Sequence, residues 1–238
     1  MSPRKTFQSI ASIYDRESSY ATELRRIYSN LKSKSDGDSQ SILITSAMIG
    51  EGKSLTSSYL AITVANLTQL KVVLVDFDLR RPKIHEYFNV GSRPGIADIL
   101  RGDMKIKAVA RKSSIPNLQI ISSGASNRTV GELIDQSDLS IIVQELKFYF
   151  DFIVIDSPPV IPVSDPLLIG DHVDGVLMVV RAGSTQREVV KRAVNLLKNA
   201  SINIYGVVAN DYEDVLPYYF KDRYYGYHYS TPTDNKAS

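Results

Sequence analysis

The chain has 238 residues, of which 43% are hydrophobic and 23% are charged, and its formal net charge is +2. These values are ordinary for a globular protein and predict one α/β domain with appended arms. The small net charge gives no support for a nucleic-acid partner, and the absence of cysteine excludes a disulfide scaffold and thiolate chemistry.

Residues 1–40 are expected to form an N-terminal arm with one helix and a linker. From Tyr20 to Leu31, apolar side chains recur at helical spacing, which predicts an amphipathic helix. The polar stretch that follows predicts a solvated linker. We expect the main domain to cover residues 41–210 and a flexible, tyrosine-rich tail to cover residues 211–238.

The motif around which the chain is organised lies at the start of the main domain. Ser41 to Thr45 predicts a buried strand, and a helix is predicted from Ser54 onward. The segment between them, Ala47-Met-Ile-Gly-Glu-Gly-Lys-Ser54, matches the phosphate-binding loop G-x-x-x-x-G-K-[ST] with alanine in place of the first glycine. That replacement is tolerated only if the first loop position does not need a positive φ.

Such a loop holds a nucleotide with backbone amides and two side chains. The two glycines let successive N–H groups surround a phosphate, and the N-terminus of the helix adds partial positive charge. Lys53 reaches the β- and γ-phosphates, and the Ser54 hydroxyl holds Mg²⁺. ATP and Mg²⁺ are therefore the expected ligands. The residues expected to bind the nucleotide here are Gly50, Glu51, Gly52, Lys53, Ser54 and Leu55.

The rest of the main domain alternates strands with helices. Apolar runs predict further strands at residues 71–76, 118–121, 152–156, 176–180 and 204–210. Helices are predicted over residues 130–150 and 187–199, with turns and short helices over residues 83–117. This order predicts an α/β fold of the P-loop NTPase class, with a largely parallel central sheet flanked by helices on both faces.

Acidic side chains follow two of the predicted strands. Asp76 and Asp78 end the second strand, and Asp156 ends the Phe152-Ile-Val-Ile run. Ligands of such sheets bind outside the carboxyl ends of the strands, so these acids are expected to converge with Lys53. Asp156 has the form of a Walker B acid, which supports Mg²⁺. Asn210 ends the last strand and is expected at the same crevice.

The two aspartates of Asp76-Phe-Asp78 can share two roles, Mg²⁺ binding and proton acceptance, in either order. Alternation along an extended strand points both carboxylates to one side, so one can steady Mg²⁺ while the other accepts a proton from an attacking hydroxyl. The spacing leaves open which is the base. Arg80 and Arg81 either neutralise phosphate charge or pair with neighbouring acids.

Several stretches together resemble the bacterial tyrosine kinases, which are cytoplasmic autokinases of capsule and exopolysaccharide biosynthesis. The resemblance extends over nearly the whole chain. It rests on the phosphate-binding loop and on residues 73–82, 95–102, 152–159, 173–183 and 206–210. It implies a protein-tyrosine kinase in which Lys53, Asp76, Asp78 and Asp156 are catalytic, Ser54, Asp78 and Asp156 hold Mg²⁺, and Asn210 lies near the adenine.

The tyrosine-rich tail completes the resemblance. The chain has fourteen tyrosines, and the resemblance implies that those of the tail accept phosphate from another subunit. The expected acceptors are Tyr212, Tyr218, Tyr219, Tyr224, Tyr225, Tyr227 and Tyr229. An aromatic tail that docks on the body of the protein or on a partner is the alternative interpretation of the same residues.

The resemblance also implies partners and a location. A membrane-anchored adaptor would activate the kinase, unphosphorylated subunits would form a ring, and a phosphotyrosine phosphatase would reverse the reaction. No apolar run approaches the roughly 20 residues of a membrane span, and no signal peptide is expected. A cytoplasmic protein held peripherally at the inner face of the membrane through its adaptor is therefore predicted.

Two other functions are compatible with a phosphate-binding loop. The first is a partitioning-type switch ATPase, whose relatives carry a signature lysine five residues before the loop lysine. Met48 occupies that position here, which disfavours this function. The second is a nucleotide-binding adaptor without catalysis, which the retained lysine, serine and acids disfavour.

Overall fold

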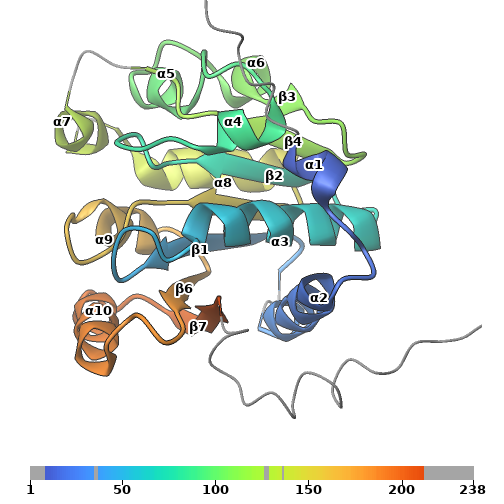
Figure 1. Ribbon diagram of the computed structural model, residues 1–238. Helices are drawn as coiled ribbons and strands as arrows, with labels where there is room; N and C mark the ends of the chain where they lie inside the picture. The colour runs from blue at the N-terminus through green and yellow to red at the C-terminus, as the bar shows by residue number, and fades with distance from the viewer. Residues whose placement is uncertain (1–8, 35–36, 126–128, 136, 212–238) are drawn as a thin grey trace, which may run out of the picture.

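A seven-stranded sheet organises the chain in the computed structural model, which describes residues 9–34, 37–125, 129–135 and 137–211 (Figure 1). The strands lie in the order β3-β4-β2-β5-β1-β6-β7, and all neighbours are parallel except β3 and β4. Their bounds are β1 Gln40–Ser46, β2 Val72–Asp76, β3 Arg111–Lys112, β4 Leu118–Ile121, β5 Phe152–Asp156, β6 Gly175–Arg181 and β7 Ile204–Asn210. The predicted largely parallel sheet is confirmed.

Helices cover both faces of the sheet, as the sequence predicted (Figure 1). The helices α1–α4 contribute to the core on one face, and α5–α10 contribute to the core on the other. Their bounds are α1 Ile10–Ile13, α2 Ser19–Lys32, α3 Lys53–Leu67, α4 Ile84–Phe88, α5 Ile96–Leu100, α6 Ile106–Val109, α7 Val130–Asp135, α8 Leu139–Tyr149, α9 Asp165–Gly170 and α10 Arg187–Asn199.

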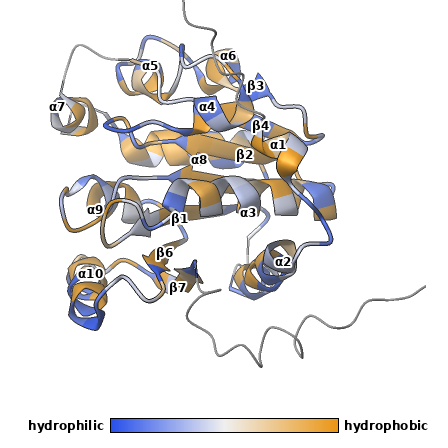
Figure 2. Ribbon diagram, in the orientation of Figure 1, coloured by the Kyte–Doolittle hydropathy of each residue, from blue (hydrophilic) through white to orange (hydrophobic). Residues whose placement is uncertain are grey.

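The central strands are apolar on both sides because both sides are covered. In β1, Ile42 and Ile44 join the core under α3, whereas Leu43 points into the opposite core. All seven residues of β1 are buried, as are all five residues of β2 and of β5. Figure 2 shows this as hydrophobic colour along the strands and the helices that pack on them. Continuous apolar runs are typical of strands buried in a parallel sheet.

The predicted helix over residues 130–150 is wrong as one element, because the structure has two helices there. α7 ends at Asp135 and α8 begins at Leu139. Asp138 has an extended backbone, and its side chain accepts hydrogen bonds from the N–H groups of Ser140 and Ile141. An aspartate in this position starts a new helix, because it satisfies amides that lack a partner in the first turn.

The N-terminal helix packs on the main domain. Leu24 and Leu31 of α2 are buried in the same core as α3, and the ring of Tyr28 lies edge-on to that of Phe152. Three short elements were not predicted, namely α1, the two-residue strand β3 and α9, because none of them is long enough to show a periodic pattern. Within the part of the chain that the structure describes, no helix is long and apolar enough to cross a membrane.

Candidate active site

The phosphate-binding loop lies between the end of β1 and the start of α3, as the sequence predicted. Gly50 and Gly52 have φ angles of 87° and 90°, in the left-handed region that only glycine adopts readily. Ala47 is fully buried and is not among the residues with positive φ. The condition for tolerating alanine at the first loop position is therefore met.

The first turn of α3 presents backbone amides toward the loop. Gly52 is the N-cap of α3 and supplies no side-chain cap, while the Thr56 N–H bonds to the Gly52 carbonyl at 2.9 Å. The amides of Lys53, Ser54 and Leu55 precede that bond and so have no partner within the helix. A Cβ built at Gly50 would meet nothing within 4 Å, so there is open space beside the loop at this position. Free amides and open space at a helix N-terminus suit a phosphate group.

Asn210 lies against the back of the same loop, at the end of β7. Its Nδ2 donates a hydrogen bond to the Glu51 carbonyl at 3.1 Å. A Cβ at Gly52 would lie 2.0 Å from that nitrogen, which is closer than any real contact. Gly52 is therefore favoured by its φ, and a larger residue there would also displace the Asn210 amide. Asn210 thus lies beside the phosphate-binding loop, and its place near the adenine stays a prediction.

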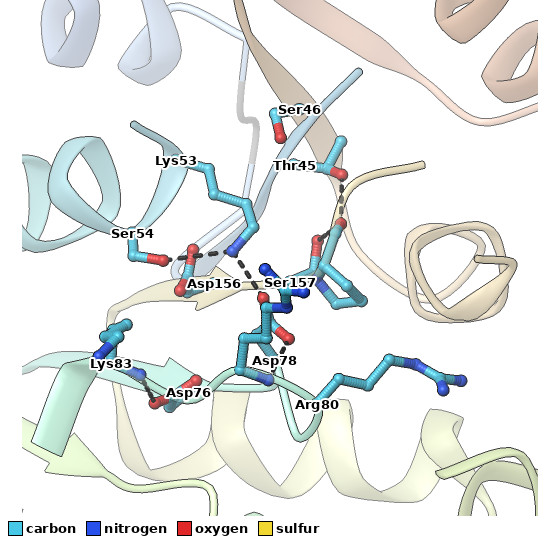
Figure 3. Close-up of polar contacts among 12 residues, drawn as sticks. Thr45, Ser46, Lys53, Ser54, Asp76, Asp78, Arg80, Lys83, Asp156 and Ser157 are labelled. Carbon is cyan, nitrogen blue, oxygen red and sulfur yellow. Dashed lines mark hydrogen bonds and ion pairs between the residues drawn. The ribbon is translucent and has the colours of Figure 1, made fainter. Parts of the chain in front are cut away.

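Lys53 and the predicted acids meet at the carboxyl ends of three neighbouring strands (Figure 3). The Lys53 Nζ lies 2.7 Å from Asp78 Oδ2 and 3.3 Å from Ser54 Oγ. Asp76 and Asp156 are paired in register at the ends of β2 and β5. All three acids are buried, and β5 lies between β1 and β2, which is why these side chains share one crevice.

The acids differ in what their oxygens contact. Asp78 uses both, because its Oδ1 also accepts the Arg81 N–H at 3.0 Å. Asp76 Oδ2 accepts the N–H groups of Lys83 and Ile84 at 3.1 and 3.0 Å. Its Oδ1 has no hydrogen-bond partner among the described residues, and the same is true of the Oδ2 of Asp156.

The burial of these charges shifts their pKa values. Removal from water is the main reason that the pKa of Asp156 rises from its ordinary value to about 6, against the opposing charge of Lys53. Burial and the nearby Asp156 carboxylate likewise raise the pKa of Asp76 well above its usual range. Burial alone would lower the pKa of Lys53, but Asp156 and Asp78 outweigh it, so that pKa is raised and the lysine stays charged.

The donor set of this crevice suits Mg²⁺ bound together with phosphates. No group of three histidine, cysteine or acidic residues could hold a metal by itself in the described part of the chain. Mg²⁺ binds through one or two carboxylates, substrate phosphates and water rather than in an all-protein cage. The buried Asp156 oxygen without a partner and the Ser54 hydroxyl are ligands of the required kind.

Arg80 pairs with an acid that the sequence did not single out. Its Nε and Nη2 donate to the two oxygens of Asp165 in α9 at 3.0 and 3.2 Å. Of the two roles that the sequence left open for Arg80, the structure favours pairing with a neighbouring acid. This pair joins the loop after β2 to the first turn of α9.

Two side chains at the site were not predicted. The Ser57 hydroxyl donates to Asp156 Oδ1 at 3.1 Å, and Thr185 donates to Glu51. Ser57 follows Lys53 by four residues, so its place on the same face of α3 was a usable signal. Thr185 lies 134 residues from Glu51, and no sequence pattern joins the two. The seven tail tyrosines predicted as acceptors lie outside the described residues.

Sequence comparison finds P-loop NTPases and tyrosine-protein kinases among the proteins similar to this chain. A ParA-type family described as NUBPL iron-transfer P-loop NTPase matches residues 38–219. The putative tyrosine-protein kinase CapB of Staphylococcus aureus is 30% identical over 212 residues, which cover 88% of this chain and 92% of CapB. The tyrosine-protein kinase ptk of Acinetobacter johnsonii is 31% identical over 160 residues, which cover 67% of this chain but only 22% of ptk.

Structure comparison also finds tyrosine kinase domains among the solved structures similar to this chain. The kinase domain of the Escherichia coli tyrosine kinase ETK superposes with a TM-score of 0.80 at 25% identity, over 87% of this chain and 82% of that domain. The chimerical protein CapA2B2 superposes with a TM-score of 0.78 at 28% identity, over 86% of this chain and 90% of the chimera. MinD of Pyrococcus horikoshii shares the fold. It superposes with a TM-score of 0.63 at 23% identity, over 74% of this chain and 72% of MinD. The family model and the match to CapB place the chain in the bacterial tyrosine-protein kinase family, within the ParA-type P-loop NTPases.

Proposed function

We propose that the protein is an ATP-dependent tyrosine autokinase that transfers the γ-phosphate of ATP to tyrosines in residues 212–229 of another subunit. The observation that carries this proposal is the meeting of Lys53 with three buried acids beside an open phosphate-binding loop. Phosphoryl transfer requires little covalent participation from the protein, so positioning and charge account for most of the catalysis.

In this proposal the loop amides and Lys53 neutralise the phosphate oxygens. The amides of Lys53, Ser54 and Leu55 point from the N-terminus of α3, where the helix dipole adds positive charge. The Lys53 ammonium is 2.7 Å from Asp78 and is therefore already held at the crevice. Such preformed donors stabilise charge that develops in the transition state.

Asp76 is the carboxylate best placed to act as base for the tyrosine hydroxyl. Asp76 Oδ1 has no hydrogen-bond partner among the described residues, whereas each oxygen of Asp78 already accepts one hydrogen bond. The amides of Lys83 and Ile84 fix the other oxygen of Asp76. The raised pKa of Asp76 makes it a stronger proton acceptor than an exposed aspartate.

Ser54, Asp78 and Asp156 are the proposed protein ligands of Mg²⁺. When bound, Mg²⁺ supplies positive charge that stabilises the oxygens of the transferred phosphoryl group. Ser57 donates to Asp156 Oδ1 and so leaves the other oxygen of that carboxylate facing the crevice. Asn210 would contribute through the loop backbone and, by resemblance, near the adenine.

The family also suggests the partners of the kinase. We propose a membrane-anchored adaptor as its activator, which would hold the protein at the inner face of the membrane. We further propose a ring of unphosphorylated subunits and a phosphotyrosine phosphatase that resets them. Regulation of capsular or exopolysaccharide synthesis is the corresponding cellular role.

The test is incubation of the full chain with ATP and Mg²⁺, with and without a candidate adaptor peptide, followed by mapping of phosphate by mass spectrometry. Phosphotyrosine in residues 212–229 that is lost in Lys53→Met supports the kinase. Arg26→Ala, a change on the exposed surface of α2, serves as the control.

The other outcomes separate the rival functions. Release of free phosphate without phosphotyrosine would indicate a switch ATPase of the partitioning type. Nucleotide binding with neither reaction would indicate a regulatory adaptor. Mixing Lys53→Met with a tail-deleted wild-type chain tests transfer between subunits, because only transfer in trans can then modify the intact tail.

A further inference from the structure

Glu51 of the phosphate-binding loop has a buried carboxylate with a partner on each oxygen. Its side chain is only 4% exposed. Oε2 accepts the N–H of Met48 at 2.7 Å, and Oε1 accepts the hydroxyl of Thr185. A buried carboxylate is costly unless it is hydrogen-bonded, so both contacts are needed to keep this side chain inside. Glu51 thus closes the loop on itself and ties it to a second loop.

The second loop is held so that its hydroxyl faces Glu51. Thr185 Oγ1 accepts the N–H of Arg181 at 3.0 Å, and the Thr185 N–H bonds to the Arg181 carbonyl at 2.9 Å. A threonine hydroxyl has one proton, and because the Arg181 amide occupies an acceptor lone pair, that proton is available to Glu51. The loop between β6 and α10 therefore offers an oriented donor to the phosphate-binding loop.

A pocket of about 410 Å³ lies between the two loops beside this contact, and its lining includes Met48, Ile49, Gln186 and Val189. Met48 and Ile49 are 45% and 55% exposed. The hydrogen bond from Thr185 to Glu51 joins the two loops directly next to this open space.

We propose that Glu51 and Thr185 are positioning residues that hold the phosphate-binding loop in its nucleotide-binding shape. The Met48 amide and the Asn210 contact to the Glu51 carbonyl fix the loop from both sides of Glu51. The β6–α10 loop thereby sets nucleotide affinity without contacting the reacting atoms. This inference rests on the proposed function for its nucleotide readout, but its geometry does not depend on that function.

The first test measures ADP·Mg²⁺ affinity by titration calorimetry. Thr185→Val removes the hydroxyl at nearly constant size and is expected to raise Kd about tenfold, the cost of a lost hydrogen bond to a charged group. Thr185→Ser keeps the hydroxyl and should restore the affinity to within about twofold. Ser184→Ala, in the same loop, is the matched control. The kcat at saturating ATP should change far less than KM, because neither the acids nor Lys53 are altered.

A second pair of variants addresses Glu51 itself. Glu51→Gln keeps an acceptor for the Met48 amide and can donate to Thr185, whereas Glu51→Ala removes both contacts. Glu51→Ala is therefore expected to raise Kd more than Glu51→Gln. Equal Kd values for Thr185→Val, Glu51→Ala and wild type would overturn the proposal.

The third measurement uses the nucleotide-free protein, which separates this inference from the proposed function. Hydrogen exchange of amides 48–52 should be faster in Thr185→Val than in Thr185→Ser, while the buried β1 amides 41–46 exchange at the wild-type rate. A protein that fails to bind nucleotide but shows this difference would refute the kinase proposal alone. Unchanged exchange at residues 48–52 would refute the positioning role, whatever the kinase activity.

Discussion

Lys53 and Asp78 form a buried ion pair, with Nζ and Oδ2 2.7 Å apart and side chains only 12% and 4% exposed. Lys53 is thus held by an acid from the segment after β2. Asp156 and Asp78 together raise the pKa of Lys53 and keep it charged. Under the proposed function, nucleotide binding would exchange one anionic partner of Lys53, Asp78, for another, a phosphate.

Asp78→Asn is expected to act in opposite directions on binding and on catalysis. Removal of its charge frees Lys53 and lowers repulsion of phosphates, so metal-free ADP should bind several-fold more tightly. Autophosphorylation should fall by about 10²-fold or more, because a proposed Mg²⁺ ligand is lost. ADP affinity in EDTA and phosphotyrosine yield with Mg²⁺ check the two effects. A variant with weaker metal-free binding would contradict the ion-pair exchange.

The pH dependence of stability should reveal the raised pKa of Asp156. A folded-state pKa of about 6 against an ordinary 3.8 means that the folded protein binds more protons between these values. The free energy of unfolding therefore falls as pH rises through that window. Above pH 6 the buried Asp156 charge lowers it by its full amount, which is about 3 kcal/mol at most. Asp156→Asn should be more stable than wild type at pH 8 and should lose this advantage near pH 4.

Urea unfolding in EDTA at pH 4, 6 and 8 measures this effect without metal. Asp138 is a control of opposite sign, since hydrogen bonds from Ser140 and Ile141 lower its pKa. The stabilising charge of Asp138 is present above its ordinary pKa, so Asp138→Ala should lose stability at neutral pH. A constant difference between Asp156→Asn and wild type across the range would contradict the raised pKa.

The two loop glycines should tolerate alanine differently. Both have positive φ, so each substitution carries strain of about 1 kcal/mol. Only Gly52→Ala also places a Cβ 2.0 Å from Asn210, whereas Gly50 faces open space. Gly52→Ala is expected to lower Tm more than Gly50→Ala does. Gly102→Ala, with φ 76° and open space around it, calibrates the strain alone.

The Arg80–Asp165 pair should be structural. Asp165 is nearly buried while Arg80 is 44% exposed, so breaking the pair should cost about 1 kcal/mol after allowance for solvent screening. Arg80→Ala and Asp165→Asn should therefore lower the free energy of unfolding by similar amounts. A large rise in the KM for ATP in Arg80→Ala alone would instead assign that arginine to phosphate binding.

The site residues that could be predicted are those close in sequence to a strand end. Asp76 and Asp156 each end an apolar run, and Lys53 belongs to the loop motif that follows β1; in a parallel sheet such strand ends meet at one edge. The roles of Asp76 and Asp78 could not be separated in this way. Their difference depends on the amides of Lys83 and Ile84, whose positions follow from how the chain turns after β2.

The sequence by itself determined the parallel α/β fold, the phosphate-binding loop and the acids, because these depend on periodicity and short motifs that act locally. Only the tertiary structure decided the partner of Arg80 and the contact of Glu51 with Thr185, because in each pair the partners lie far apart along the chain, at separations of 85 and 134 residues. The break before α8 is a local feature, because Asp138 accepts hydrogen bonds from amides two and three residues away. For the phosphate-binding loop, the sequence motif identified the residues, whereas the contacts of the loop with Asn210 and Thr185 could be seen only in the tertiary structure.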